Sequence, residues 1–201
     1  MAAAVAVPPT LSLHQIKAKF RMNKDISSNV EEVLKAQNVS WATRTAIKYS
    51  PVSLLVDNHT DDATATEYYV STQLLPGGIK SEENRVLDNA VHEKVSPVFG
   101  PVKGQNGWIT VADAAAIHPY LGEGWDNPED AGLVHAYTEG DATKKKGCEW
   151  YSHQVFGFAM VDLGDGKPQR MYISKLWFRA PGLPEGGVTK RLVYDYCPDD
   201  E

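Results

Sequence analysis

The chain has 201 residues, a net charge of −6 and an isoelectric point near 5.5, and 42% of its residues are hydrophobic. The acidic balance argues against nucleic acid and anionic membrane surfaces as partners, because these select basic faces. No run reaches the roughly 20 apolar residues that membrane insertion requires. Two cysteines set no disulfide framework, and no secretory signal is recognised, so a cytoplasmic location is expected.

The domain organisation is expected to be simple, with an N-terminal arm at 1–24, a single domain at 25–197 and a short tail at 198–201. Pro8 and Pro9 interrupt any helix in the arm. The arm could cap the domain or dock on a second copy, so a homodimer is one arrangement open to the chain. No internal repeat and no low-complexity linker divides the sequence.

A helix is predicted at 27–37, "SSNVEEVLKAQ", where Ser28 and Glu31 fit a capping box. After residue 38 the pattern changes to a period of two, which predicts strands. A short helix is expected near 111–121. The expected strands lie at 39–49, 52–57, 64–75, 83–91, 92–100, 102–111, 132–140, 149–163, 169–179 and 191–197, the last of them as an edge strand.

These elements predict a mainly β fold. Short strands separated by turn residues favour an antiparallel meander over units that alternate strands with helices. We expect a single antiparallel up-and-down β-barrel with an N-terminal helix and one short additional helix, because closure removes sheet edges and gives every strand an inside and an outside.

The hairpin at 149–179 carries the strongest local signal. Both faces of its first strand are largely apolar, yet His153 and Gln154 interrupt them, and Ser174 and Lys175 interrupt the partner strand. A surface sheet would show one polar face. A barrel whose apolar lumen holds a few hydrogen-bonding groups explains the pattern, since small-molecule pockets have this composition. The sequence leaves open which face points inward.

A resemblance to a known family covers residues 25–178. The segments on which it rests are "VSWATRTAI" after the opening helix, "ENRVLDNAVHEKVSPVFGPVKGQNGW", "GEGW", "EWYSHQVFGF" and "RMYISKLWF". These segments resemble lipocalin-like (calycin-type) barrels, and more narrowly small fungal lipocalin-like proteins. The resemblance implies a barrel that binds a hydrophobic metabolite. It also implies that the chain could act as a cyclase or isomerase in a natural-product pathway, as some fungal proteins of this shape do.

Catalytic signatures for phosphate binding, serine hydrolysis, zinc peptidase chemistry and thiol redox chemistry are absent from the sequence, so no cofactor and no metal is expected. Candidates for catalysis are residues that can donate or accept protons or stabilise charge. Candidates for ligand binding are aromatic side chains that could line a pocket and one side-chain amide. The catalytic candidates are His135, Tyr137, Arg85, His153 and Lys175, and the ligand-binding candidates are Trp41, Tyr68, Trp108, Gln154, Phe156, Phe158 and Trp177.

Each candidate has a structural alternative. His135 and His153 could be satisfied within the wall, or could hold a metal or haem. Arg85 could pair with surface carboxylates, and Lys175 could extend to the barrel mouth. The favoured hypothesis is a cofactor-independent cyclase, isomerase or dehydratase that acts on a hydrophobic secondary metabolite inside the barrel. The alternative is a non-catalytic carrier of such a small molecule.

Overall fold

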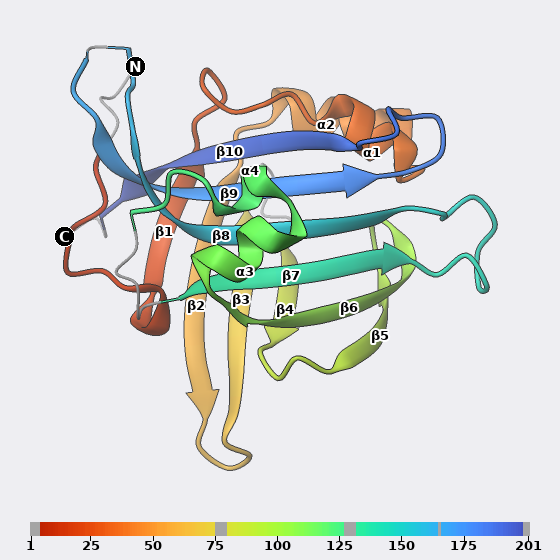
Figure 1. Cartoon of the computed structure of the whole chain (residues 1–201), viewed down its shortest axis with the longest axis horizontal. Helices are drawn as coiled ribbons and strands as arrows, with labels where there is room; N and C mark the ends of the chain where they lie inside the picture. The colour runs from red at the N-terminus through yellow and green to blue at the C-terminus, as the bar shows by residue number, and fades with distance from the viewer. Residues whose placement is uncertain (1–4, 75–79, 127–131, 165, 199–201) are drawn as a thin grey trace.

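The computed structural model describes residues 5–74, 80–126, 132–164 and 166–198, and its strands form one continuous antiparallel sheet (Figure 1). The strands are β1 (Lys17–Met22), β2 (Ser53–Asp61), β3 (Thr66–Leu74), β4 (Lys80–Val86), β5 (Val91–Ser96), β6 (Gly100–Ile109), β7 (Leu133–Gly140), β8 (Tyr151–Val161), β9 (Gln169–Arg179) and β10 (Val188–Cys197). The helices are α1 (Glu31–Ala36), α2 (Trp41–Tyr49), α3 (Val111–Ile117) and α4 (Pro119–Gly122).

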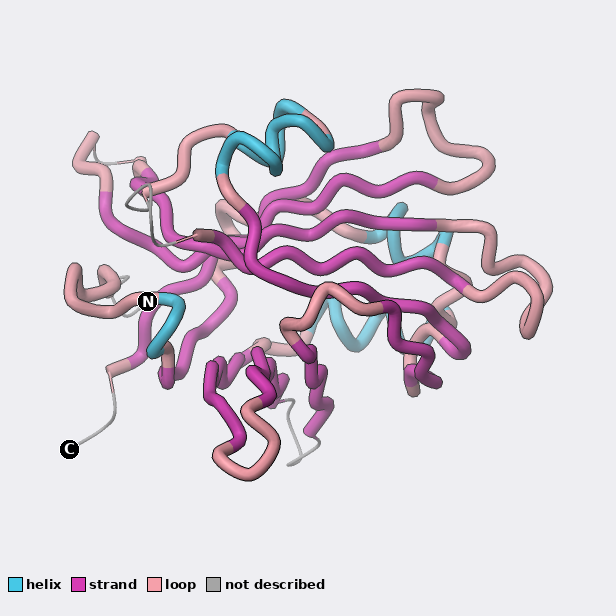
Figure 2. Tube along the Cα trace, turned by 60° about the horizontal axis from the view of Figure 1, so that its bottom comes forward, coloured by secondary structure: helices cyan, strands magenta, loops and turns pink. Residues whose placement is uncertain are grey.

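The sheet is up-and-down except where the first strand pairs with the last, which gives the order β4-β3-β2-β1-β10-β9-β8-β7-β6-β5. The sheet curls so that β1 to β4 cross behind β7 to β10, which makes a half-barrel (Figures 1 and 2). The prediction of a mainly β, single antiparallel up-and-down fold is therefore confirmed. The described residues contain four α-helices in place of the two expected.

Contacts between strands that are not neighbours identify the concave side. Tyr69 of β3 meets Tyr172 of β9, and the guanidinium of Arg85 on β4 lies 5.2 Å from the ring centre of Phe156 on β8. Side chains alternate between the faces of a strand. The even-numbered residues of β8, which include Gln154, consequently face the concave interior, and the odd-numbered residues face outward.

The two ends of the half-barrel are filled by apolar side chains. At one end, Val7, Leu13 and Ile16 of the N-terminal segment pack among the buried residues of the concave face. At the other end, Val33 of α1 packs with a second buried cluster that includes Trp150 and Phe178. Three buried tyrosines, Tyr69, Tyr172 and Tyr194, belong to the first of these clusters. No helix in the described part of the chain combines the length and apolarity needed to cross a membrane.

Residues 41–49 form a helix, α2, so the strand predicted at 39–49 is wrong. The Ser40 side chain caps its N-terminus by accepting from the Thr43 amide at 3.2 Å. At its C-terminus, the Lys24 ammonium donates to the carbonyls of Ile47, Lys48 and Ser50 at 3.1, 2.7 and 2.6 Å. No side chain of α2 is buried, so packing does not impose an apolar stripe of helical period on its sequence. The contacts at its two ends stabilise the helical conformation instead.

Two further expectations need correction. Residues 17–22 belong to the sheet as β1 rather than to an arm, because Phe20 fills the core while Lys17, Lys19 and Arg21 point away. Strand β10 is central rather than an edge, since β1 occupies its free side.

Helix α1 exists as predicted but begins at Glu31, without the expected capping box. The Asn29 side chain accepts from the Glu31 amide at 2.8 Å. Ser28 instead accepts from the amide of Arg191 on β10 at 3.0 Å. The Ser28 hydroxyl group, which the sequence pattern predicts as a helix cap, therefore joins the segment before α1 to β10.

We predict that Lys24→Met loosens α2 and leaves the sheet intact, because Lys24 alone satisfies three carbonyls at the helix end. The free energy of local opening should fall by roughly 1 kcal/mol, the usual net value of a hydrogen bond. Amide hydrogen exchange resolved by segment would show faster exchange at 41–50, and Lys19→Met is the matched control. Unchanged exchange in α2 would contradict this role.

Candidate functional site

Three tyrosines form the polar centre of the concave face. The hydroxyl oxygens of Tyr69 and Tyr172 are 2.5 Å apart, and both residues are fully buried. Burial raises the pKa of each well above its usual value, so both phenols are neutral at any physiological pH. Burial also raises the pKa of Tyr194, which adjoins Tyr172, to about 12. The centre therefore offers hydroxyl groups and no charge of its own.

Arg85 supplies the charge beside this centre. It lies opposite Tyr69 in the pairing of β3 with β4, and its Nη1 donates to Ser71 Oγ at 3.1 Å. The guanidinium packs over the Phe156 ring. Within the described residues no carboxylate lies at ion-pair distance from Arg85, although the side chain is half-buried. A cation held without a counter-ion can attract an anionic or carbonyl oxygen.

Strands β8 and β9 complete the concave wall. Gln154 Nε2 donates to Ser174 Oγ at 3.1 Å, so the amide predicted for ligand binding is held by a neighbour. Phe156 and Phe158 follow on the same face and are almost completely buried. Trp108 of β6 donates from Nε1 to Glu67 on β3 at 2.9 Å and contacts the ring of His14. These residues form an apolar wall with a few fixed donors.

The predicted site residues divide between the two faces of the sheet. The concave side holds five of them: Arg85, Trp108, Gln154, Phe156 and Phe158. The convex side holds another six: Tyr68, His135, Tyr137, His153, Lys175 and Trp177. Trp41 lies on α2 with 72% of its surface exposed. The structure therefore does not bring the imidazoles together with Arg85.

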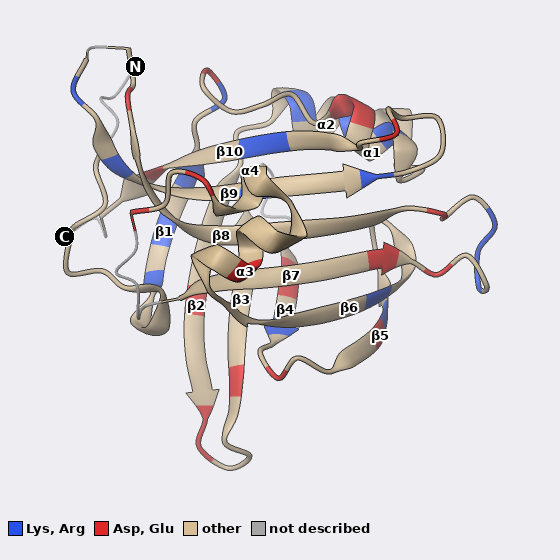
Figure 3. Ribbon diagram, in the orientation of Figure 1, with Lys and Arg blue, Asp and Glu red and all other residues tan. Residues whose placement is uncertain are grey.

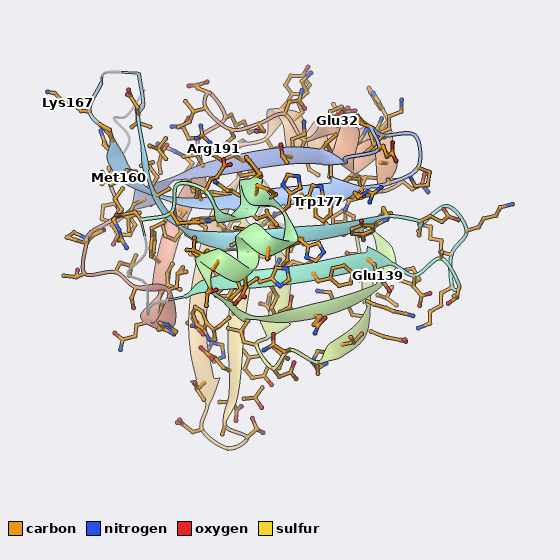
Figure 4. The ribbon with its side chains drawn as sticks, in the orientation of Figure 1. Glu32, Glu139, Met160, Lys167, Trp177 and Arg191 are labelled. Atoms are coloured by element: carbon orange, nitrogen blue, oxygen red, sulfur yellow. The ribbon has the colours of Figure 1, made fainter. Side chains whose placement is uncertain are left out.

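Four of the convex residues form a cluster of neighbouring rings, namely His135, Tyr137, His153 and Trp177. Figure 4 shows Trp177 on the side of the sheet that carries α3 and α4. His135 Nε2 and His153 Nδ1 are 3.0 Å apart, and the His153 ring stacks on Trp177. The ring of His118, which lies between α3 and α4, also stacks on Trp177. Burial, reinforced by His153, lowers the pKa of His135 to about 4. Within the described residues no group of three or more His, Cys, Asp or Glu side chains is placed to hold a metal ion.

Lys175 has a structural partner on the convex side. Its ammonium donates to the carbonyls of Tyr120 and Glu123 and lies over the rings of Tyr120 and Trp125. Burial lowers its pKa. The side chain therefore neither lines the lumen nor extends to a barrel mouth, but fastens α4 to β9.

A cavity of about 200 Å³ lies between the helix pair α1–α2 and the strands β1 and β10. Its apolar lining includes Met22, Leu34, Ile47 and Leu192, with Arg44 among its polar residues. Met22 pairs with Tyr194 across β1 and β10, so the cavity adjoins the tyrosine centre. A larger, more open hollow of about 570 Å³ lies around His14 and His59.

Sequence reasoning missed the tyrosine centre as a unit. Tyr69 comes from β3, which is far in the chain from β9 and β10, the strands of Tyr172 and Tyr194. Each tyrosine on its own is indistinguishable from a packing residue. Tyr172 and Ser174 are two residues apart and therefore lie on the same face of one strand, which the sequence does show. This is informative only when it is known which face points inward.

We predict that His135 makes the fold less stable in mild acid. Its folded pKa is about 4, whereas the ordinary value for an exposed imidazole is 6.5. The unfolded chain therefore gains a proton first, and the stability contributed above pH 6.5 is lost as the pH falls toward 4. Urea unfolding followed by circular dichroism should show a shallower loss in His135→Gln than in the wild type. His59→Gln, which replaces an exposed histidine, is the control, and equal pH slopes in all three proteins would refute the assignment.

Comparison with known proteins agrees with this architecture. No protein-family model matches the chain. A relative described as "Probable pericyclase scpY" from Mollisia scopiformis is 28% identical over 194 residues, covering 95% of this chain and 94% of the relative.

Several experimental structures share the fold. A fatty-acid-binding protein from brain tissue of Drosophila melanogaster has a TM-score of 0.52 at 16% identity, over 88% of this chain and 95% of that one. The Schistosoma mansoni fatty-acid-binding protein in complex with arachidonic acid has a TM-score of 0.53 at 13% identity, over 94% and 99%. The chain thus has the lipocalin-like (calycin-type) fold expected from its sequence.

Proposed function

We propose that this protein is a cofactor-independent cyclase or isomerase that binds a hydrophobic metabolite on its concave face. The observation that carries the proposal is Arg85, a cation without a carboxylate partner in the described structure, set between an aromatic wall and three neutral tyrosines. The fungal relative, which matches nearly the whole chain, is described as a probable pericyclase and supports the same class of reaction.

The mechanism requires two contributions from the protein. Phe156 and Phe158 would hold the carbon skeleton of the substrate in a folded conformer, which removes part of the entropic barrier to ring closure. Arg85 would donate to a carbonyl or enolate oxygen whose electron density increases in the transition state. The tyrosine phenols stay protonated, so they can donate hydrogen bonds without gaining or losing a proton. A concerted pericyclic reorganisation of bonds within one molecule needs no external acid, base or electron carrier.

The carrier alternative uses the same residues differently. Several proteins of similar fold are described as fatty-acid-binding proteins, so a guest held on the concave face without chemical change is the second candidate function. The cation and the phenols would then serve only to bind the guest.

We predict that Arg85→Gln abolishes most product formation while the protein stays folded. Deleting the gene in the native host should cause an uncyclised isomer, equal in mass to the product, to accumulate. The wild-type gene should restore the product, whereas Arg85→Gln should lower the rate by about 100-fold, the usual effect of losing one oxyanion donor. Liquid chromatography with mass spectrometry measures both species. Arg179→Gln, which removes an arginine from the convex face, is the matched control.

A second prediction decides which face of the sheet is used. If the reaction occurs on the concave side, His153→Ala should convert the accumulated isomer at nearly the wild-type rate in vitro, and Arg85→Gln should not. The opposite result would place catalysis at the histidine stack. A wild-type protein that binds the isomer but leaves its spontaneous first-order rate unchanged would favour the carrier.

A further inference from the structure

Among the described residues the sheet does not close on itself, and the strands at its two ends are β4 and β5. In the described part of the chain, no backbone pairing joins these two strands. The connection at 87–90 ties β4 to β6 at one end of the gap, because the Asn89 amide donates to Asn106 and the Gln105 side chain donates to Asn89, at 2.9 and 2.8 Å. We call the remaining gap, between Glu83 on β4 and Lys94 on β5, the seam.

A single ion pair bridges the seam within the described residues. Lys94 Nζ lies 2.6 Å from Glu83 Oε2. Register places both side chains on the concave side, since Glu83 pairs with the buried Ser71 and Lys94 pairs with the buried Val102. The Lys94 and Glu83 side chains remain 39% and 30% exposed. Ion pairs in such positions are weak and are screened by salt. Figure 3 shows that charged residues gather on β4 and β5, whereas β8 carries almost none.

The residues directly behind the ion pair are those of the proposed site. Arg85 is two residues beyond Glu83 on the same face, and its guanidinium contacts Ser71. Arg85 is half-buried, whereas its neighbour Tyr69 is fully buried. Solvent therefore reaches the concave face as far as Arg85, and it does so next to the seam.

We propose that the seam between β4 and β5 is the entrance to the concave face, and that the Lys94–Glu83 ion pair is its latch. Breaking one weak ion pair would separate two strand edges that share no backbone hydrogen bonds, which is a smaller change than displacing any paired strand. The biological role of this entrance rests on the proposed function, since it matters only when a guest is bound inside.

A competing entrance lies beneath α2, where the cavity of about 200 Å³ adjoins the tyrosine centre. Opening there requires release of the three carbonyl contacts of Lys24 and of the Arg44–Glu31 ion pair at 2.7 Å. More contacts hold this side than hold the seam. The experiment is designed to separate the two routes.

The test measures how fast a reagent reaches a thiol placed behind the latch. Ser71→Cys is made in a Cys197→Ser background, and alkylation of the introduced thiol by N-ethylmaleimide is followed by peptide-resolved mass spectrometry, which separates it from the buried Cys148. Adding Lys94→Met should raise the alkylation rate several-fold. Added salt should raise the rate of the parent protein and leave that of the Lys94→Met variant unchanged.

Two matched controls accompany this variant. Lys144→Met removes a lysine that pairs with Glu93 on the outer face of β5, and it should not change the rate. Lys24→Met loosens α2 and should also have no effect. A rate that rises with Lys24→Met and not with Lys94→Met would move the entrance to the helix pair, and a rate indifferent to Lys94→Met would overturn the latch. Gln154→Cys repeats the measurement on the same face if Ser71→Cys does not fold.

The alkylation assay uses no guest molecule, so its outcome is independent of catalysis. If Lys94→Met raises the alkylation rate but the protein shows no turnover, the proposed function alone is contradicted. If the protein cyclises its substrate but Lys94→Met leaves the alkylation rate unchanged, the proposed latch alone is contradicted.

Discussion

The pairing of the first strand with the last is the constraint on which the rest of this structure depends. Phe20 of β1 lies opposite Tyr196 of β10, and four such residue pairs join the strands. Without this ladder the sheet would separate into a four-stranded piece, β1 to β4, and a six-stranded piece, β5 to β10. The contact between Tyr69 and Tyr172, and the approach of Arg85 to Phe156, each join one piece to the other. The candidate site is thus a product of the β1–β10 pairing rather than of any local segment.

Because side chains alternate along a strand, the polar residues of the sheet lie on two opposite faces. On β8, Gln154 and Phe156 point into the half-barrel, whereas His153 and Val155 point outward toward the region of α3 and α4. Both faces of this strand are covered, which explains why both are largely apolar. The polar residues that interrupt them serve different purposes. Gln154 belongs to the concave wall, and His153 belongs to a ring stack that packs beneath short helices.

The sequence predicts the strands well and the arrangement of the site only in part. The hairpin of β8 and β9 is predictable because two aromatic-rich runs flank a segment of turn residues. Helix α2 is not predictable from its period, since none of its side chains is buried and Lys24, far from it in sequence, caps its end. β1 is missed because only Phe20 of its six residues is fully buried. The tyrosine centre is missed because it unites β3, β9 and β10, and residue parity becomes meaningful only after the inward face of each strand is known.

The fastening of α4 by Lys175 has a consequence for the order in which the molecule assembles. A helix of four residues has no stability of its own. The lysine that holds its end lies 55 residues beyond Tyr120 and 52 residues beyond Glu123. During synthesis this lysine becomes available to α4 only after the chain has emerged as far as β9 and that strand has joined the sheet. The contacts that fasten α4 to β9 therefore form late, after the strands that they join are complete.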